Sequence, residues 1–127
     1  MTSPAELAIQ RKLTQRLIDA LPVTLVLTPQ VRVSDGSGGW SWEEGEPRTA
    51  QTFHLIEFGG GGSDLNPVRA ADGSQRYAEM QLLGAWDSSM DQGDRFSYGG
   101  EEWEIIELMR NNGWERRALV ARFGGGF

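Results

Sequence analysis

The chain has 127 residues and a mass of 14.1 kDa, which is the size of one ordinary domain. It contains no cysteine, one histidine (His54) and one lysine (Lys12) beside eleven arginines. This composition excludes disulfides, zinc–thiolate sites, cysteine nucleophiles and multi-histidine metal sites. Lys12 stands in Arg-Lys-Leu, so a phosphate-binding Gly-Lys-Ser/Thr loop is excluded as well. The formal net charge of −6 argues against a protein that wraps nucleic acid, which needs clustered lysine and arginine.

No apolar run approaches the length that spans a bilayer, and the N-terminus lacks the charged-then-apolar pattern of a secretory signal. We therefore expect a soluble intracellular protein without a membrane partner. The five tryptophans indicate a packed fold rather than a disordered chain. We expect residues 1–127 to form a single domain.

Residues 3–21 are expected to form a helix. Ser3-Pro4-Ala5-Glu6 is a capping box with proline at the first helical position, and Pro22 ends the segment. The apolar residues of this segment share one broad face, which Gln10 and Thr14 interrupt. They are Leu7, Leu13, Leu17, Ile18 and Leu21. We expect the helix to pack on a sheet or on a neighbouring subunit.

After Pro22 the apolar pattern changes to the period of two that is typical of strands. The expected strands are 23–27, 31–33, 49–58, 77–83, 94–98, 102–109 and 114–123. Alternation places Ala78, Met80 and Leu82 on one face of their strand, and Ile106 and Leu108 on one face of theirs.

Turn residues separate these strands. Residues 34–39 are a glycine-rich turn, Gly99-Gly100 predicts a two-residue hairpin turn, and Asn112-Gly113 predicts another tight turn. Residues 59–75 show no periodic pattern and are expected to form a long loop, of the kind that is usually functional or disordered. Residues 43–47 and 86–92 are expected to be polar connections.

A helix followed by about six antiparallel strands predicts a mainly β protein. The expected fold is a small antiparallel β-barrel or sandwich, formed by residues 22–123, with the N-terminal α-helix 3–21. Residues 124–127, Gly-Gly-Gly-Phe, are expected to be a flexible tail.

The sequence offers no convincing catalytic, metal or cofactor site. Glu102 and Glu104 resemble the solvated end of a strand, and no Gly-x-Ser-x-Gly elbow supports a catalytic triad built on His54. The run 59–62 is four glycines, but no helix start follows it to complete a phosphate site. We therefore expect a protein that is not an enzyme and that uses no cofactor.

Trp40 and Trp42 fall on the same side of an extended segment, beside a glycine-rich turn and an acidic loop. Packing in the core and anchoring of a protein interface are both open for this pair. The glycine runs and the long loop are segments that gain structure against a neighbour, which favours an assembly component over an enzyme.

Four segments carry a resemblance to a known family. They are 48–56 (Arg-Thr-Ala-Gln-Thr-Phe-His-Leu-Ile), 93–96 (Gly-Asp-Arg-Phe), 100–106 (Gly-Glu-Glu-Trp-Glu-Ile-Ile) and 112–120 (Asn-Gly-Trp-Glu-Arg-Arg-Ala-Leu-Val). Their order resembles the small head-completion, or head-to-tail stopper, proteins of long-tailed bacteriophages, over residues 22–123. In that family a Gly-Asp-x-Phe strand and a Gly-x-x-Trp/Tyr-Glu-Val strand form a hairpin before a final strand.

The resemblance implies a structural protein of the virion neck, assembled in the cytoplasm of a bacterial host. Such a protein would form a ring with copies of itself, below the portal and adaptor proteins and above the tail terminator and tail tube. The ring would retain packaged DNA, which passes through its lumen without sequence-specific binding, and would dock the tail. Interface residues would then be Trp40, Trp42, Leu13 and Leu17. Lumen or gating residues in the long loop would be Gly60, Gly61, Asp64, Asn66, Arg69 and Asp72.

Two alternatives stay open. A tail terminator or head–tail adaptor is the nearest, although adaptors tend to be helical and this chain is mostly strand. A small nucleic-acid-binding β-barrel is the alternative from a different class, and it would need exposed tryptophans beside arginines.

Overall fold

The computed structural model describes residues 3–57 and 68–123, and it confirms a mainly β protein with one N-terminal helix. Helix α1 spans Pro4–Ala20. The strands are β1 (Val23–Leu25), β2 (Gln30–Ser34), β3 (Trp40–Glu44), β4 (Gln51–Glu57), β5 (Val68–Arg69), β6 (Gln75–Arg76), β7 (Met80–Ala85), β8 (Arg95–Tyr98), β9 (Glu101–Leu108) and β10 (Glu115–Arg122).

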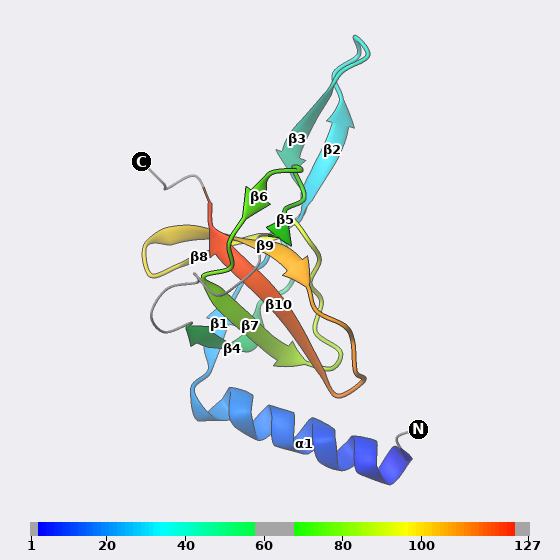
Figure 1. Cartoon of the computed structure of the whole chain (residues 1–127), viewed down its shortest axis with the longest axis vertical. Helices are drawn as coiled ribbons and strands as arrows, with labels where there is room; N and C mark the ends of the chain where they lie inside the picture. Colours follow the sequence, from blue (N-terminus) through cyan, green and yellow to red (C-terminus); the bar gives the residue numbers. More distant parts are fainter. Residues whose placement is uncertain (1–2, 58–67, 124–127) are drawn as a thin grey trace.

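Six strands form one antiparallel sheet that is nearly closed into a barrel (Figure 1). Their order is β1-β4-β7-β10-β9-β8. The two edge strands approach each other through an isolated bridge, in which the backbone N–H groups of Thr28 and Arg95 each donate to the other residue's carbonyl, at 2.8 and 2.9 Å. The pairs β2–β3 and β5–β6 are two-stranded ribbons outside this sheet.

The barrel interior is filled by side chains from all six strands of the sheet and from the segments that follow β1 and β7. Phe53 in β4, Leu82 in β7 and Val120 in β10 have no exposed surface and lie in this core. A second, smaller cluster lies on the outer side of β9 and β10, beneath the β5–β6 hairpin. It consists of Ala70, Ala78, Ile106 and Ala121.

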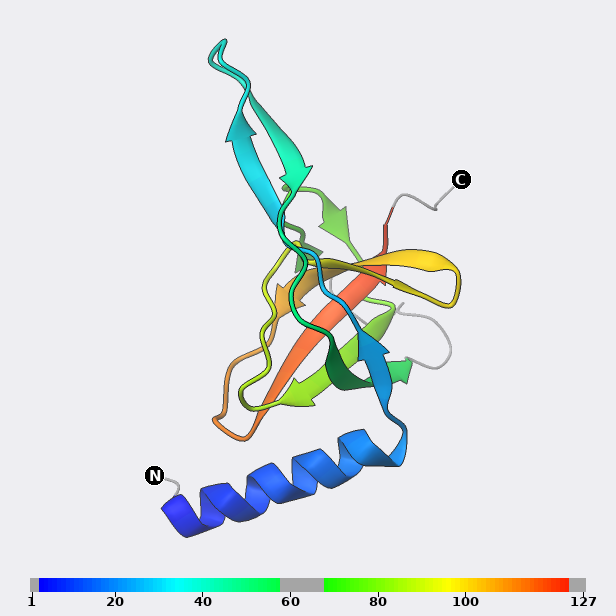
Figure 2. The same cartoon turned by 180° about the vertical axis from the view of Figure 1, so that it is seen from behind.

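Helix α1 lies across one end of the barrel, against β4 and β7 (Figures 1 and 2). Its predicted start is confirmed, because the Ser3 hydroxyl accepts a hydrogen bond from the Glu6 N–H at 3.2 Å. The face of the helix that packs on the barrel differs from the apolar face that the sequence predicts. Only Thr14 and Ile18 are buried and Leu7 is half-buried beside Gly113, so the helix meets the barrel along a narrow line that leaves Leu13 and Leu17 exposed.

The predicted β8–β9 hairpin is confirmed. Gly99 and Gly100 both have positive φ, +63° and +80°, as the two-residue turns that match strand twist require. The pairing of β9 with β10 shifts by one residue, from Leu119–Glu107 to Val120–Ile105, which leaves Ile106 as an extra residue. The prediction that Ile106 and Leu108 share a face is therefore wrong: Leu108 packs against the main core and Ile106 lies in the outer cluster.

The predicted long loop 59–75 is partly wrong. Residues 68–76 form the β5–β6 hairpin around an Asp72-Gly73 turn, and residues 58–67 lie outside the described part of the chain. The strand predicted at 77–83 begins later, at Met80. Ala78 precedes it and packs in the outer cluster, so it does not share a face with Met80 and Leu82.

Candidate interaction site

The β2–β3 hairpin stands away from the barrel at the end opposite to α1 (Figure 1). We call residues 30–44 the arm. Its strands pair from Gln30–Glu44 to Ser34–Trp40. The Asp35 carboxylate accepts hydrogen bonds from the Ser37 N–H at 2.8 Å and the Gly39 N–H at 3.1 Å, and these bonds lower the pKa of Asp35. The tip of the arm is therefore shaped by its own polar contacts and needs no core.

The arm carries two exposed tryptophans. Trp40 is 58% exposed and Trp42 is 48% exposed, and both point to the same face of β3. The guanidinium of Arg32 lies 4.7 Å from the centre of the Trp40 ring, a distance at which a cation is attracted to the ring face. Of the two possibilities left open for this pair, core packing is wrong. Their role in an interface stays a prediction.

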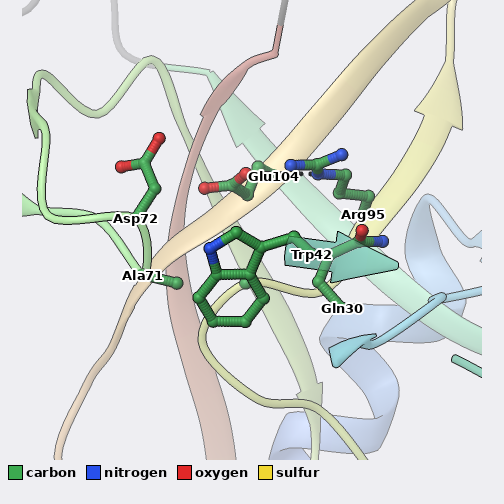
Figure 3. Close-up of a pocket in the computed structure, with 7 residues that line it drawn as sticks. Gln30, Trp42, Ala71, Asp72, Arg95 and Glu104 are labelled. Atoms are coloured by element: carbon green, nitrogen blue, oxygen red, sulfur yellow. Dashed lines mark hydrogen bonds and ion pairs between the residues drawn. The ribbon is translucent and has the colours of Figure 1, made fainter. Parts of the chain in front are cut away.

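A small pocket lies where the arm joins the barrel (Figure 3). Trp42 comes from the arm, Asp72 from the β5–β6 turn, and Arg95 and Glu104 from the β8–β9 hairpin. Two of the predicted site residues, Trp42 and Asp72, are thus brought to one place. Asp72 itself holds its turn, since its carboxylate accepts from the Ser74 hydroxyl at 2.6 Å and the Ser74 N–H at 2.9 Å, which lowers the pKa of Asp72.

Glu104 is only 2% exposed, so the prediction of a solvated carboxylate is wrong for this residue. Arg76 donates to it from Nη1 at 3.2 Å, and Arg95 donates from Nε at 3.3 Å. Burial raises the pKa of Glu104, and the two arginines lower it in part. A cross-strand signal was present in the sequence: pairing outward from the Gly99-Gly100 turn places Arg95 opposite Glu104.

Replacing Glu104 by glutamine is expected to change how stability depends on pH. The folded chain binds the Glu104 proton more tightly than the unfolded chain, because the folded pKa lies above the ordinary 4.5. The stability contributed by Glu104 is thus present below that ordinary pKa and is lost as the pH rises through the raised value. From about pH 4 to about pH 7, the free energy of unfolding of the natural chain should fall relative to that of Glu104→Gln.

Urea denaturation at several pH values measures this difference. Glu102→Gln, which removes an exposed carboxylate from the same strand, is the matched control. A difference between the natural chain and Glu104→Gln that stays constant over this pH range would contradict the prediction.

The outer face of α1 is the second exposed apolar surface. Ile9, Leu13, Leu17 and Leu21 follow one another every four residues and are between 43% and 69% exposed. We call these four residues the stripe. They are exposed because the helix meets the barrel through Thr14 and Ile18 instead. The predicted interface residues Leu13 and Leu17 therefore lie at the end of the molecule opposite to Trp40 and Trp42 (Figure 2).

Of the remaining predicted site residues the structure describes Arg69, which does not lie with these surfaces. Arg69 is an exposed residue of β5, and its carbonyl accepts a hydrogen bond from Gln92 Nε2 at 2.9 Å. Gly60, Gly61, Asp64 and Asn66 lie outside the described residues, so the predicted lumen or gating loop stays a prediction.

Within residues 3–57 and 68–123, no group of three or more histidine or carboxylate side chains is placed to hold a metal ion. His54 Nδ1 lies 3.3 Å from the Leu21 carbonyl oxygen, at the junction of helix and barrel. The described residues include no helix long and apolar enough to cross a membrane. Among the described residues, the arm and the stripe hold seven of the eleven large apolar side chains that are exposed.

A scan against protein-family models gives no match, and a search of curated proteins gives no significant match either.

Proposed function

We propose that this chain is a structural neck protein of a tailed bacteriophage. It is a ring subunit between the portal and adaptor proteins and the tail, which retains packaged DNA and docks the tail. The observation that carries the proposal is the presence of two exposed apolar surfaces at opposite ends of one barrel, the arm and the stripe. The family resemblance of residues 22–123 supports the same reading.

Exposed tryptophans and leucines on a small protein are best explained by partners that cover them. Large aromatic side chains anchor protein interfaces because their burial removes much apolar surface from water. A subunit of a closed ring contacts a neighbouring copy on each of two sides and needs one such surface for each contact. The barrel between them supplies a rigid spacer, since its core is formed by strands from both ends of the sequence.

The acidic balance of the chain suits a channel for DNA. A net charge of −6 repels the phosphate backbone and gives no counterion-release driving force for binding. In the proposed ring, DNA moves past the subunits without adhering to them, and retention is a matter of steric closure. In this proposal, no described residue is assigned to reading the DNA sequence.

The test is electron microscopy of lysates from the phage that encodes the chain, with its gene disrupted. Separate tails, together with heads that package DNA and then lose it, are the expected products. Intact infectious virions would overturn the proposal. Finding the protein on isolated tails would support the tail-terminator alternative instead.

Complementation with variants connects this test to the arm. A plasmid-borne chain with Trp40→Ala and Trp42→Ala is expected to lower the yield of infectious particles at least tenfold, because loss of about 1.4 kcal/mol of binding already weakens an interface tenfold. Tyr77→Ala removes another exposed aromatic outside the arm and should restore normal yield. Equal yields from both plasmids would contradict a role for the arm in assembly.

One observation favours the nucleic-acid-binding alternative. Trp40 is exposed beside Arg32, and Trp86 is exposed beside Arg11, whose guanidinium lies 3.7 Å from the Trp86 ring centre. Stacking on tryptophan would quench its fluorescence when single-stranded DNA is added, with a strong salt dependence. Our proposal expects no quenching. Salt-dependent quenching that Trp40→Ala removes would favour the alternative.

A further inference from the structure

We propose that the arm of one copy docks on the stripe of the next copy. The contact would be heterologous, so that every subunit gives its arm to one neighbour and its helix to the other. The inference rests on the proposed function in one respect, because a ring requires copies of the chain to meet. The inference adds which two surfaces of neighbouring copies are in contact.

The two surfaces match in spacing. Trp40 and Trp42 are two residues apart on a strand, which separates them by about 6.6 Å. Ile9, Leu13 and Leu17 of the stripe are four apart on the helix, which separates each from the next by about 6 Å, and Leu21 is the C-cap. The exposed parts of the two indole rings can therefore lie in the spaces between three consecutive aliphatic side chains, while the rest of Trp42 stays against the pocket of its own chain.

The two surfaces also match in charge. Residues 30–46 contain four carboxylates and one arginine, with Glu43 and Glu44 exposed beside Trp42. Lys12 and Arg16 are exposed on α1, each one residue before a leucine of the stripe. None of these four charged side chains forms an ion pair with another residue of the described ranges 3–57 and 68–123. Together with Arg11, the basic residues Lys12 and Arg16 outnumber the two acidic residues of this helix, Glu6 and Asp19. Acidic residues thus flank the aromatic surface, and basic residues flank the aliphatic one.

The geometry makes a second copy the partner. The arm and the helix lie at opposite ends of the molecule in both views, so the arm cannot cover the stripe of its own chain (Figures 1 and 2). Each chain nevertheless carries both complementary surfaces. A contact between two different surfaces of identical chains repeats from copy to copy, and it ends in a closed ring or continues as a filament.

Sedimentation of the purified chain over a wide range of concentrations tests the inference. The natural chain should rise above the monomer mass of 14.1 kDa as its concentration increases. An arm variant (Trp40→Ala with Trp42→Ala) and a helix variant (Leu13→Gln with Leu17→Gln) should each stay at the monomer mass. Glutamine is a good helix former and these leucines are exposed, so the helix variant should fold, which circular dichroism verifies.

Mixing the two variants gives the decisive result. The arm variant keeps an intact stripe and the helix variant keeps an intact arm, so an equimolar mixture should form a species of two chains and no larger one. A natural chain that stays monomeric at every concentration would overturn the inference. So would variants that assemble like the natural chain, or a mixture that stays monomeric while the natural chain assembles.

Charge reversal provides a second, independent measurement. Glu43→Lys with Glu44→Lys should weaken assembly, and adding Lys12→Glu with Arg16→Glu to the same chain should restore it. Tyr77→Ala is the matched control and should assemble normally. A monomeric chain whose gene disruption still yields heads that lose DNA would refute this contact and leave the neck function standing. Assembly of the natural chain, together with infectious virions after gene disruption, would support this contact and refute the neck function.

Discussion

Replacing Asp94 by alanine is expected to lower the free energy of unfolding by about 3 kcal/mol. The Asp94 side chain is 1% exposed and accepts three hydrogen bonds. Two come from Arg48, from Nε at 2.8 Å and Nη2 at 3.2 Å, and one comes from the Asp91 N–H at 3.0 Å. The variant leaves the largely covered Arg48 guanidinium without its carboxylate. Urea denaturation of the natural and variant chains measures the loss.

Variants of both partners separate the ion pair from the packing around it. Arg48→Ala should also be strongly destabilising, because it leaves the Asp94 carboxylate buried without a cation. The double variant should lose less than the two single variants together, since neither charge is then left alone. Strictly additive losses would show that Arg48 and Asp94 contribute independently, contrary to the expectation.

Replacing Phe53 by alanine is expected to cost about 4 kcal/mol, because it leaves a cavity in the centre of the barrel. Phe53 and Ser88 together leave no space for a side chain at position 84, which is glycine. A Cβ at Gly84 would lie 2.9 Å from Cε1 of the Phe53 ring and 2.6 Å from the Ser88 hydroxyl oxygen. Gly84→Ala should therefore cost about 2 kcal/mol through overpacking. Thermal and urea denaturation measure both losses.

The energetic coupling between positions 53 and 84 tests whether the two residues are in direct contact. A chain with Phe53→Leu and Gly84→Ala should be more stable than the sum of the single effects predicts, because the smaller side chain frees space for the added methyl group. The matched control combines Gly84→Ala with Val120→Ala, a buried residue four positions along β10 from the partner of Gly84. That pair should be additive. Equal coupling in both pairs would contradict direct contact between Phe53 and position 84.

Local signals in the sequence predicted the elements of the fold well. Ser3 and Pro4 identified the start of α1, and the Gly99-Gly100 pair identified the β8–β9 hairpin, because caps and tight turns depend on residues that are close in the chain. The placement of Leu108 and Ala78 was wrong for a different reason. The extra residue in β9 and the late start of β7 each change which side chains face the barrel core. No local sequence pattern indicates either feature.

The sequence indicates candidate interface residues but does not indicate that their side chains are exposed. The interface role of Trp40, Trp42, Leu13 and Leu17 stays a prediction, and the sequence alone leaves a core role open for the tryptophans. Their exposure depends on how α1 and the arm are seated on the barrel, which long-range packing decides. The burial of Glu104 is not predicted, because one of the two arginines that bind its carboxylate, Arg76, lies in a hairpin where the sequence indicates a loop.

The nearly closed barrel has a consequence for its dynamics. Strand β1 is held by three residue pairs with β4, and beyond it only the Thr28–Arg95 bridge joins the two edges of the sheet in the part of the chain that the structure describes. Segments with few bonds open at a lower free energy than the whole domain unfolds. Opening of β1 would nevertheless expose Leu25, which is 4% exposed and part of the barrel core, so side-chain packing holds this edge more than backbone pairing does. The position of the helix that carries the stripe consequently depends on the packing of Thr14 and Ile18 rather than on backbone pairing.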